Sequence, residues 1–232
     1  AGGKGKPQTV PIGQDGSQTA PTNPLFSLQL TPSLQKEWVR LPDFPGPARI
    51  QPVLTAQQSE DGIRLYLAGG FQPASAHQEA IVCTDMLSYH PKTKQWRNEG
   101  FLPSLAGGSH RTVTGGCAIA SGDSSILLVG GVNYDRFRDA LNHPEPDYLL
   151  HPADWYKFNT SLLQYNTFTK HWTHLGNYEE LARAGAGIAN NANTVIIIGG
   201  ELKPGIRTPE VNAFKLIILS RKYSTTQNNN QE

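Results

Sequence analysis

A glutamate and an arginine lie six positions apart in the segment GGELKPGIRTPEV, at Glu201 and Arg207. The glycine pair that opens this segment follows the apolar run VIII, and a Pro-Gly turn separates the two charged residues. A carboxylate can accept and return a proton, and a planar guanidinium can hold an anion through two parallel hydrogen bonds. The pair could therefore form a base with an anion clamp, or a salt bridge that closes the loop. The residues alone leave both interpretations open.

Apolar runs that end in Gly-Gly recur along the chain and indicate a repeated unit. The chain begins AGG, and the runs RLYLAGG, SILLVGG and VIIIGG end at Gly70, Gly131 and Gly200, so the second glycines of the four pairs are 67, 61 and 69 residues apart. Each of the first three pairs is followed by an aromatic segment that ends in tryptophan, and two of these segments, YHPKTKQW and YNTFTKHW, align residue for residue. This order resembles the kelch repeat, in which each unit forms one four-stranded blade of a β-propeller.

The physical chemistry of these residues fits that architecture. An apolar run with little alternation suits an inner strand that is buried on both faces. Two glycines allow a sharp exit from the strand without a Cβ to clash near the crowded axis. Tyrosine and tryptophan supply large apolar areas for packing one blade on the next. We therefore predict an all-β, kelch-type β-propeller rather than a β-sandwich with coincidental glycine turns.

The repeats divide the chain into a propeller segment, residues 1–220, and a polar C-terminal tail, residues 221–232. The blade parts are predicted near residues 1–38, 39–96, 97–172 and 173–220. They amount to the outer half of one blade, two whole blades and most of a fourth. Propellers have about four to eight blades, so we expect a ring of six blades whose missing members come from an N-terminal segment outside this chain.

Two stretches interrupt the repeats. Residues 4–24 have no apolar periodicity and many turn formers, which predicts a long loop between strands. Residues 134–159 are inserted into the third blade part, and their apolar spacing is partly helical until Pro144 and Pro146 interrupt it. The insertion could form a lid or wall of a binding site, or it could pack against the side of the propeller.

Composition excludes several classes of protein. The formal net charge of the 232 residues is +1, which gives no broad electrostatic footprint for nucleic acid. No apolar run approaches the roughly 20 residues of a membrane span. Cys83 and Cys117 do not form a CxxC pair, so metal binding and dithiol redox chemistry are disfavoured. We interpret them as small buried apolar residues on strands, and a disulfide requires neighbouring strands to bring them together.

Several segments resemble one kelch family in particular, the sialic acid mutarotases or N-acetylneuraminate epimerases. These segments are FPGPARIQPVLTAQ (44–57), DMLSYHPKTKQW (85–96), LLVGGVN (127–133) and, above all, GGELKPGIRTPEV (199–211). The resemblance covers about residues 25–218 and is closest to a cyclically permuted branch, whose other blades come first in sequence. It implies a six-bladed propeller, interconversion of the α and β anomers of N-acetylneuraminate, and a periplasmic or secreted location. It also implies that Glu201 is the proton acceptor and that Arg207 is its neighbouring arginine.

Mutarotation is chemistry that these residue types can perform. The reaction opens a hemiketal ring and closes it on the other face, so it needs a base for the anomeric hydroxyl and an acid for the ring oxygen. One well-placed carboxylate can move both protons, and such transfer contributes about 10²–10⁴-fold. The substrate carries a carboxylate that a guanidinium can bind. We expect no metal or redox cofactor.

Three further residues stand at comparable places in the other blade parts, and we predict that they bind substrate together with Arg207. Arg49, in GPARIQP, could be a second carboxylate clamp or a surface arginine. Asn133, in GGVN, could hydrogen-bond sugar hydroxyl groups or serve as a turn residue. His110, in GGSHRT, could be a second proton carrier, or a solvated or capping histidine.

A different class of function fits the same repeats. Kelch propellers also occur as modules without catalysis, which bind a glycan or a protein partner through their loops. The role of Glu201 distinguishes this alternative from a small-molecule isomerase.

Overall fold

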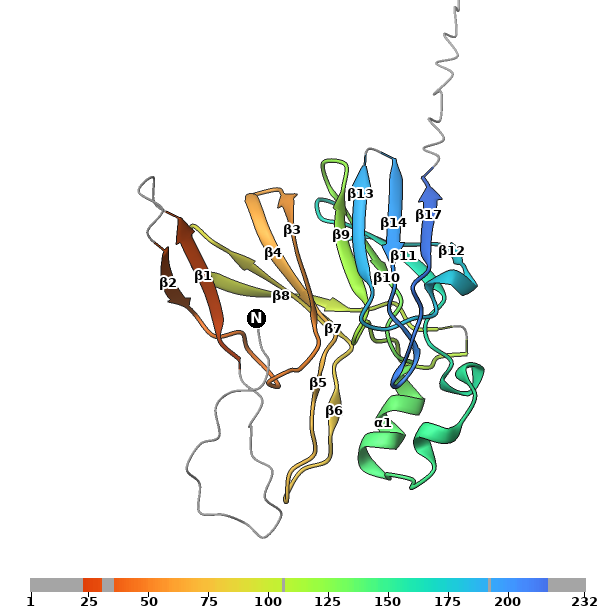
Figure 1. Ribbon diagram of the computed structural model, residues 1–232. Coiled ribbons are helices and arrows are strands. Elements are labelled where there is room, and N and C mark those ends of the chain that lie inside the picture. The colour runs from red at the N-terminus through yellow and green to blue at the C-terminus, as the bar shows by residue number, and fades with distance from the viewer. Residues whose placement is uncertain (1–22, 31–35, 106, 192, 217–232) are drawn as a thin grey trace, which may run out of the picture.

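The computed structural model describes residues 23–30, 36–105, 107–191 and 193–216, and it is built almost entirely from antiparallel sheets (Figure 1). Four sheets follow one another along the chain, and we name them sheets I to IV. Sheet I pairs β1 (Leu25–Leu30) with β2 (Lys36–Leu41). Sheet II has the order β3 (Val53–Ser59), β4 (Gly62–Ala68), β7 (Asp85–His90) and β8 (Gln95–Phe101).

The next two sheets repeat this order. Sheet III contains β9 (Cys117–Ser121), β10 (Ser125–Val129), β11 (Ser161–Asn166) and β12 (Trp172–Asn177). Sheet IV contains β13 (Gly187–Asn191), β14 (Thr194–Ile198) and β17 (Val211–Lys215). Neighbours in the chain are thus neighbours in each sheet, as in a propeller blade, and the all-β prediction is confirmed.

Short elements connect the second and third strands of these sheets. Two are hairpins, β5 (Phe71–Gln72) with β6 (Ile81–Val82) and β15 (Glu201–Lys203) with β16 (Ile206–Arg207). In sheet III the connection is the predicted insertion, which folds as α1 (Tyr134–Asn142) followed by two 3-10 turns, η1 (Tyr148–Leu150) and η2 (Ala153–Tyr156). A further 3-10 turn, η3 (Glu179–Leu181), precedes sheet IV. None of the described helices is long and apolar enough to cross a membrane.

The first strands of the sheets meet one another, because β9 contacts both β3 and β13. The strands that end in Gly-Gly are the second strands, β4, β10 and β14, each flanked by two partners. β10 is buried on both faces, as predicted, whereas β14 buries Val195 and Ile197 and leaves Ile198 47% exposed. The strands that contact the neighbouring sheets are chiefly the first strands, β3, β9 and β13. β10 has a hydrogen-bonded neighbour on each side and a sheet packed on each face, which explains its unbroken apolar character.

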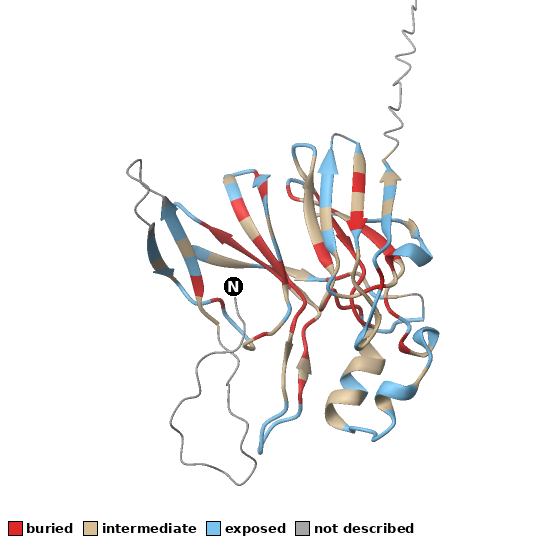
Figure 2. Cartoon of the chain, viewed as in Figure 1, coloured by how far each residue is buried: buried red, intermediate tan, exposed pale blue. Residues whose placement is uncertain are grey.

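Alternate side chains of these second strands build two separate cores, which appear as the red bands in the middle of the sheets in Figure 2. On β10, Ile126 and Leu128 face sheet II and pack with Tyr66 and Met86, among others. Leu127 and its alternate neighbour Val129 face sheet IV instead. Because successive side chains of a strand point to opposite faces, β10 contributes to the core on each side of sheet III.

The aromatic residues of the repeats pack in pairs on adjacent strands. Tyr89 contacts Trp96 with ring centroids 5.1 Å apart, and Tyr165 contacts Trp172 at 4.8 Å. Tyr66 also reaches across from sheet II to Tyr165 in sheet III at 6.1 Å. The repeated aromatic segments therefore stabilise both a single sheet and the contact between two sheets.

The glycine pairs are required by close approach of the backbone. Gly130 and Gly131 have φ values of +66° and +87°, and a Cβ on either would lie 2.6 Å from the Arg183 carbonyl oxygen or 2.7 Å from that of Thr114. Only glycine fits there without displacing the backbone that leads into the next sheet. The predicted sharp exit after each apolar run is confirmed.

A buried arginine fastens the entry of sheet II. Arg49 is fully buried, and its guanidinium binds both carboxylate oxygens of Asp85 at 3.0 and 3.1 Å and donates to the Gly69 carbonyl oxygen at 3.1 Å. These bonds tie the segment before β3 to the end of β4 and the start of β7. Because the pair is bidentate and buried, we expect it to contribute to the stability of this entry.

The entry of sheet IV is held by an equivalent arginine and carboxylate, whereas the entry of sheet III is held by an asparagine. Arg183 donates to the Gly199 carbonyl oxygen at 3.1 Å and pairs with Glu210 at 3.4 Å. The equivalent positions in sheet III are Val113 and Ser161, which cannot form an ion pair. There the amide of Asn159 donates instead to the carbonyl oxygens of Thr112, Gly130 and Val132, at 2.8, 3.2 and 2.9 Å.

The two cysteines are free and buried, as interpreted from the sequence. Burial raises the pKa of Cys83 and of Cys117 to about 11, and the Cys117 thiol donates to the carbonyl oxygen of Ala186. Two other predictions lie wholly or mostly outside the described residues: the loop at residues 4–24, up to residue 22, and the polar tail at residues 221–232.

Candidate functional site

Glu201 and Arg207 both line a cavity of about 630 Å³, at the end of the sheets where the Gly-Gly loops emerge. Its volume falls within the range of about 300–1,000 Å³ that is typical of small-molecule sites. Three groups of residues form its wall: the β15–β16 hairpin, the segments that enter sheets II, III and IV, and the insertion between β10 and β11. Segments far apart in the sequence therefore converge on one space.

The hairpin holds the two charged side chains opposite each other. Glu201 pairs with Arg207 in the β15–β16 register, and Arg207 Nε lies 3.3 Å from Glu201 Oε1. The side chain of Arg207 is 80% exposed and that of Glu201 is 30% exposed. An exposed ion pair contributes only about 0.2–1 kcal/mol, so either group can exchange its partner for a ligand at little cost. The salt bridge of the second interpretation is present, and both of its members also line the cavity, as a base with an anion clamp would have to do.

The backbone of Glu201 is fixed although its side chain is accessible. Its N–H donates to the Ala184 carbonyl oxygen at 2.7 Å, and its own carbonyl oxygen accepts from the Ala184 N–H at 3.0 Å. Thr208 N–H donates to the Gly200 carbonyl oxygen at 2.9 Å and closes the base of the hairpin. The site thus presents its carboxylate from a rigid base, which favours a defined geometry for proton transfer.

Three equivalent residues that enter the sheets form a hydrogen-bonded row on the cavity wall. Gly115 N–H donates to the Gln51 carbonyl oxygen at 3.0 Å, and Gly185 N–H donates to the Gly115 carbonyl oxygen at 2.7 Å. All three residues have left-handed backbone, with φ values of +55°, +70° and +64° in chain order. This conformation costs a residue with a Cβ roughly 1–2 kcal/mol, so the glutamine is the exception in the row.

The insertion supplies an aromatic wall. Phe137, Tyr148 and Phe158 line the cavity. Lys203 ties this wall to the hairpin, because its ammonium group donates to the carbonyl oxygens of Leu149 and His151 at 3.2 and 2.6 Å. The expectation that the insertion forms a wall of the site agrees with this placement.

The three other predicted site residues are not among those that line the cavity. Arg49 is committed to Asp85 and is buried, so its position supports a role in packing rather than in binding a ligand. Asn133 caps the N-terminus of α1, where its side-chain oxygen accepts from the Arg136 N–H at 3.1 Å. His110 is exposed and packs edge-on against Tyr134, with ring centroids 5.1 Å apart.

Arg111 is a buried cation that no sequence motif singles out. It is 7% exposed, and its Nε and Nη1 have no hydrogen-bond partner among the described residues. Burial lowers its pKa, and no neighbouring carboxylate offsets that effect. The other buried arginines of the described chain, Arg49, Arg64 and Arg183, each contact a carboxylate.

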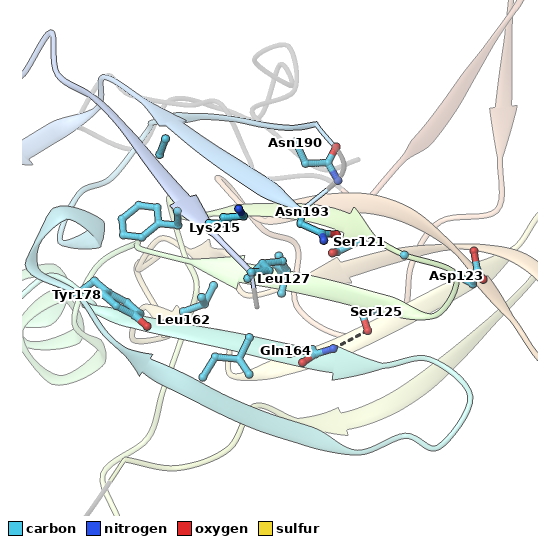
Figure 3. A pocket seen from close by; sticks show the side chains of 15 residues that line it. Ser121, Asp123, Ser125, Leu127, Leu162, Gln164, Tyr178, Asn190, Asn193 and Lys215 are labelled. Carbon is cyan, nitrogen blue, oxygen red and sulfur yellow. Dashed lines mark hydrogen bonds between the residues drawn. The ribbon is translucent and has the colours of Figure 1, made fainter. Parts of the chain in front are cut away.

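A larger cavity of about 1,090 Å³ lies between sheets III and IV and is shown in Figure 3. Its polar contacts include the hydrogen bond from Gln164 to Ser125 at 2.6 Å, and Leu127 and Leu162 form part of its wall. Phe214 also lines it, at the position that Tyr89 and Tyr165 occupy in their sheets. In those sheets a tryptophan of the fourth strand packs on the tyrosine, whereas β17 has no further partner among the described strands. We therefore regard this space as part of the packing between sheets.

One group of side chains in the described ranges has the spacing of a metal site. Ligand atoms of Glu145, Asp147 and His151 lie within 4.8 Å of one another. The two carboxylates are exposed, and the imidazole of His151 is stacked on Trp155 with ring centroids 3.9 Å apart. Exposed acidic groups of this kind are common on loops, and we assign no function to them.

Sequence reasoning missed Gln51 and the aromatic wall. A signal for Gln51 was present, because PARIQPV, RTVTGGC and LARAGAG align without gaps and place it where the other two segments carry glycine. The aromatic residues of the insertion could be recognised as apolar, but nothing local indicates which of them faces a cavity.

Known proteins with similar sequences and structures point to one family. The N-acetylneuraminate epimerase family matches residues 8–229. The N-acetylneuraminate epimerase of Pasteurella multocida is 27% identical over 215 residues, which cover 87% of this chain and 52% of that protein. The N-acetylneuraminate epimerase of Yersinia enterocolitica is 30% identical over 189 residues, which cover 75% of this chain and 45% of that protein. The chain therefore spans about half the length of the curated relatives it matches.

The fold has a solved counterpart as well. The structure of YjhT aligns with a TM-score of 0.67 and 26% sequence identity, and the match covers 86% of this chain and 60% of that one. The prediction of a kelch-type propeller is confirmed by this likeness.

Proposed function

The chain belongs to the N-acetylneuraminate epimerase family, and from that premise we propose that it is an isomerase that interconverts the α and β anomers of N-acetylneuraminate, with Glu201 moving the protons. The observation that carries this proposal is the placement of Glu201 and Arg207 side by side on the wall of one cavity. The reaction needs a group that serves as base and then as acid, and the acidic sugar needs an anion-binding group to hold it there.

Ring opening uses the carboxylate first as a base and then as an acid. Glu201 accepts the proton of the anomeric hydroxyl, the bond between the anomeric carbon and the ring oxygen breaks, and a ketone forms. The ring oxygen leaves with the electron pair of that bond and takes the proton from Glu201. Rotation about the adjacent carbon–carbon bond exposes the other face of the ketone, and the reverse steps close the ring. The carboxylate ends unchanged, so a single group can serve every turnover.

Arg207 binds the carboxylate of the sugar in this proposal. Its guanidinium is exposed and makes a single contact with Glu201, at 3.3 Å through Nε, so its remaining donors can engage a second carboxylate. Such charge-assisted, planar contacts orient the ligand as well as bind it. The anomeric carbon of the sugar carries this carboxylate, and the reacting atoms are thereby placed beside Glu201.

Because the chain spans about half the length of its relatives, the activity of the whole protein belongs to the proposal. We propose that further blades, from a segment outside this chain, complete the ring. The open sheets support this, since sheet I has two described strands and sheet IV has three. The periplasmic or secreted location that the resemblance implies belongs to the same proposal, and fractionation of cells that express the full protein tests it.

Exchange between the two anomers can be followed directly by NMR saturation transfer. The wild-type protein is expected to accelerate the exchange, and Glu201→Gln to return it to the uncatalysed rate while the fold is retained. Glu180→Gln is a suitable control, because this exposed glutamate of η3 does not line the cavity. Exchange at the uncatalysed rate with the full-length wild-type protein would contradict the isomerase proposal. If a sugar still bound in that case, a module that binds glycans without catalysis would be favoured.

A further inference from the structure

Gln51 keeps a side chain at a position where the backbone favours glycine. It has a φ of +55°, and the equivalent residues at the entries of sheets III and IV are Gly115 and Gly185. Glutamine has no special tolerance of left-handed backbone, unlike asparagine, aspartate or glycine. Residues held in such conformations cluster at sites of function, where the surrounding structure enforces them.

The side chain of Gln51 is part of the cavity wall. It is exposed, and its carboxamide makes no hydrogen bond with a described residue. A Cβ at Gly115 would lie 3.7 Å from Gln51 Oε1, so the carboxamide extends over the bare glycine of the next sheet. A Cβ at Gly185 would meet no atom within 4 Å. Of the three equivalent positions, only that of Gln51 therefore carries a side chain, and it lies beside the glycine of the next sheet.

The surroundings of this amide differ from those of the charged pair. Glu201 and Arg207 come from the β15–β16 hairpin, whereas Gln51 precedes β3, and the apolar residues Pro52, Val132 and Phe137 share the same cavity. A ligand in the cavity thus meets charged residues of the β15–β16 hairpin, the amide at the entry of sheet II, and apolar residues of the connection between β10 and β11.

We propose that Gln51 determines specificity by recognising an N-acyl substituent of the sugar, an inference that rests on the function proposed above. A carboxamide carries one acceptor and two donors. Its Nε2–H can donate to the acyl oxygen while its Oε1 accepts from the N–H of the substituent, so the two amides pair through two hydrogen bonds. The methyl group of an acetyl substituent then contacts the apolar wall. A hydroxyl group in the same place lacks both the second bonding atom and the methyl group.

The test compares two ligands and two matched variants. The ligands are N-acetylneuraminate and its analogue with a hydroxyl group in place of the acetamido group. Gln51→Gly removes the carboxamide and relieves the left-handed backbone. Lys94→Gly makes the same backbone change at φ +56° in the exposed turn between β7 and β8, and Lys94 does not line the cavity. Gln51→Asn keeps an amide on a shorter stem and serves as a second variant.

Binding is measured by titration, and stability by thermal unfolding. The wild-type protein is expected to prefer the acetamido sugar. Gln51→Gly should weaken binding of that sugar about tenfold, the value of one or two lost neutral hydrogen bonds, and leave the hydroxyl analogue unaffected. Lys94→Gly should preserve the preference. Neither glycine variant should unfold at a lower temperature than the wild type, because glycine relieves the strain of a positive φ. Gln51→Asn should lose most of the preference.

The possible failures separate the two proposals. If the wild type binds both sugars equally, or if Gln51→Gly retains the full preference, the inference about Gln51 is wrong and the isomerase proposal stands. If the wild type binds neither sugar, both are wrong.

Discussion

Arg207 lies opposite Glu201 on the paired strands β15 and β16, with 3.3 Å between Arg207 Nε and Glu201 Oε1, at the rim of the cavity and not beneath a closed surface. The two side chains attract each other only weakly, because the pair is exposed, and a ligand in the cavity can reach both. Four predictions follow from this pair and from other contacts of the fold, and each can be checked without a ligand-bound structure.

Arg207→Met is expected to weaken binding of an acidic sugar about 10–100-fold, the range for hydrogen bonds to a charged group. The free energy of unfolding should change by less than about 1 kcal/mol, because the ion pair is exposed. Titration with the acidic sugar at low and high salt measures the affinity. The variant should also show a smaller salt dependence of binding, because one charge that contacts the ligand is gone. Arg40→Met removes an exposed ion pair with Asp43 on sheet I and should leave binding unchanged. Unaltered affinity in Arg207→Met would argue against the carboxylate clamp.

Lys203→Met is expected to loosen the aromatic wall, because Lys203 donates to the carbonyl oxygens of Leu149 and His151. Amide hydrogen exchange should become faster in residues 148–156 and in the β15–β16 hairpin, with little change in sheets II and III. Lys92→Met, in the exposed turn after β7, is the matched control. Equal protection in the two variants would show that the wall is held by its aromatic packing alone.

Two buried arginines should respond to the same substitution in opposite directions. Arg49→Met leaves the carboxylate of Asp85 without its partner and should lower the free energy of unfolding by about 3–5 kcal/mol. Arg111→Met removes a buried cation with no carboxylate nearby and should raise that free energy by about 1 kcal/mol or more. Urea denaturation at neutral pH measures both. A loss of stability in Arg111→Met would mean that its charge has a partner in solution.

Acid should destabilise the fold through Glu99, whose carboxylate is 3% exposed. Burial acts to raise its pKa, but hydrogen bonds from Ser88 at 2.5 Å, Arg97 at 2.8 Å and Tyr165 at 3.0 Å outweigh burial, and the net pKa is lowered. A lowered carboxyl pKa adds stability above the pKa of the unfolded chain, about 4.3, and this stability is lost as the pH falls through the folded value.

Glu99→Gln tests this contribution. The variant should be less stable than the wild type at pH 7, and its free energy of unfolding should fall less steeply below pH 5. Denaturation series at several pH values compare the two proteins, and Glu37→Gln, at an exposed position on β2, controls for the loss of one surface charge. Parallel profiles for the wild type and Glu99→Gln would assign the acid sensitivity to other groups.

Much of the fold could be predicted because its signals are local and repeated. The run VIII before Gly199 and Gly200 indicates a buried strand that leaves sharply, and the paired tyrosine and tryptophan indicate two adjacent outer strands. These features depend on side-chain size and backbone sterics within about a dozen residues. The helical character of residues 134–159 is visible in its spacing for the same reason.

The site was predicted only where its residues are close in sequence. Glu201 and Arg207 belong to one hairpin, so their proximity follows from a single turn. Arg49 contacts Asp85, which lies 36 residues away, and only the recurrence of the same pairing at Arg183 and Glu210 indicates that this arginine holds the fold together. Whether an arginine stabilises the fold or binds a ligand therefore depends on partners that are far away in the sequence.

The entry of sheet III is fastened by the neutral amide of Asn159, whereas those of sheets II and IV depend on carboxylates, Asp85 and Glu210. Sheet III also carries the insertion that supplies the aromatic side of the cavity. The aromatic side of the cavity therefore extends from a sheet whose entry is anchored by neutral hydrogen bonds, between two sheets whose entries are anchored by charge.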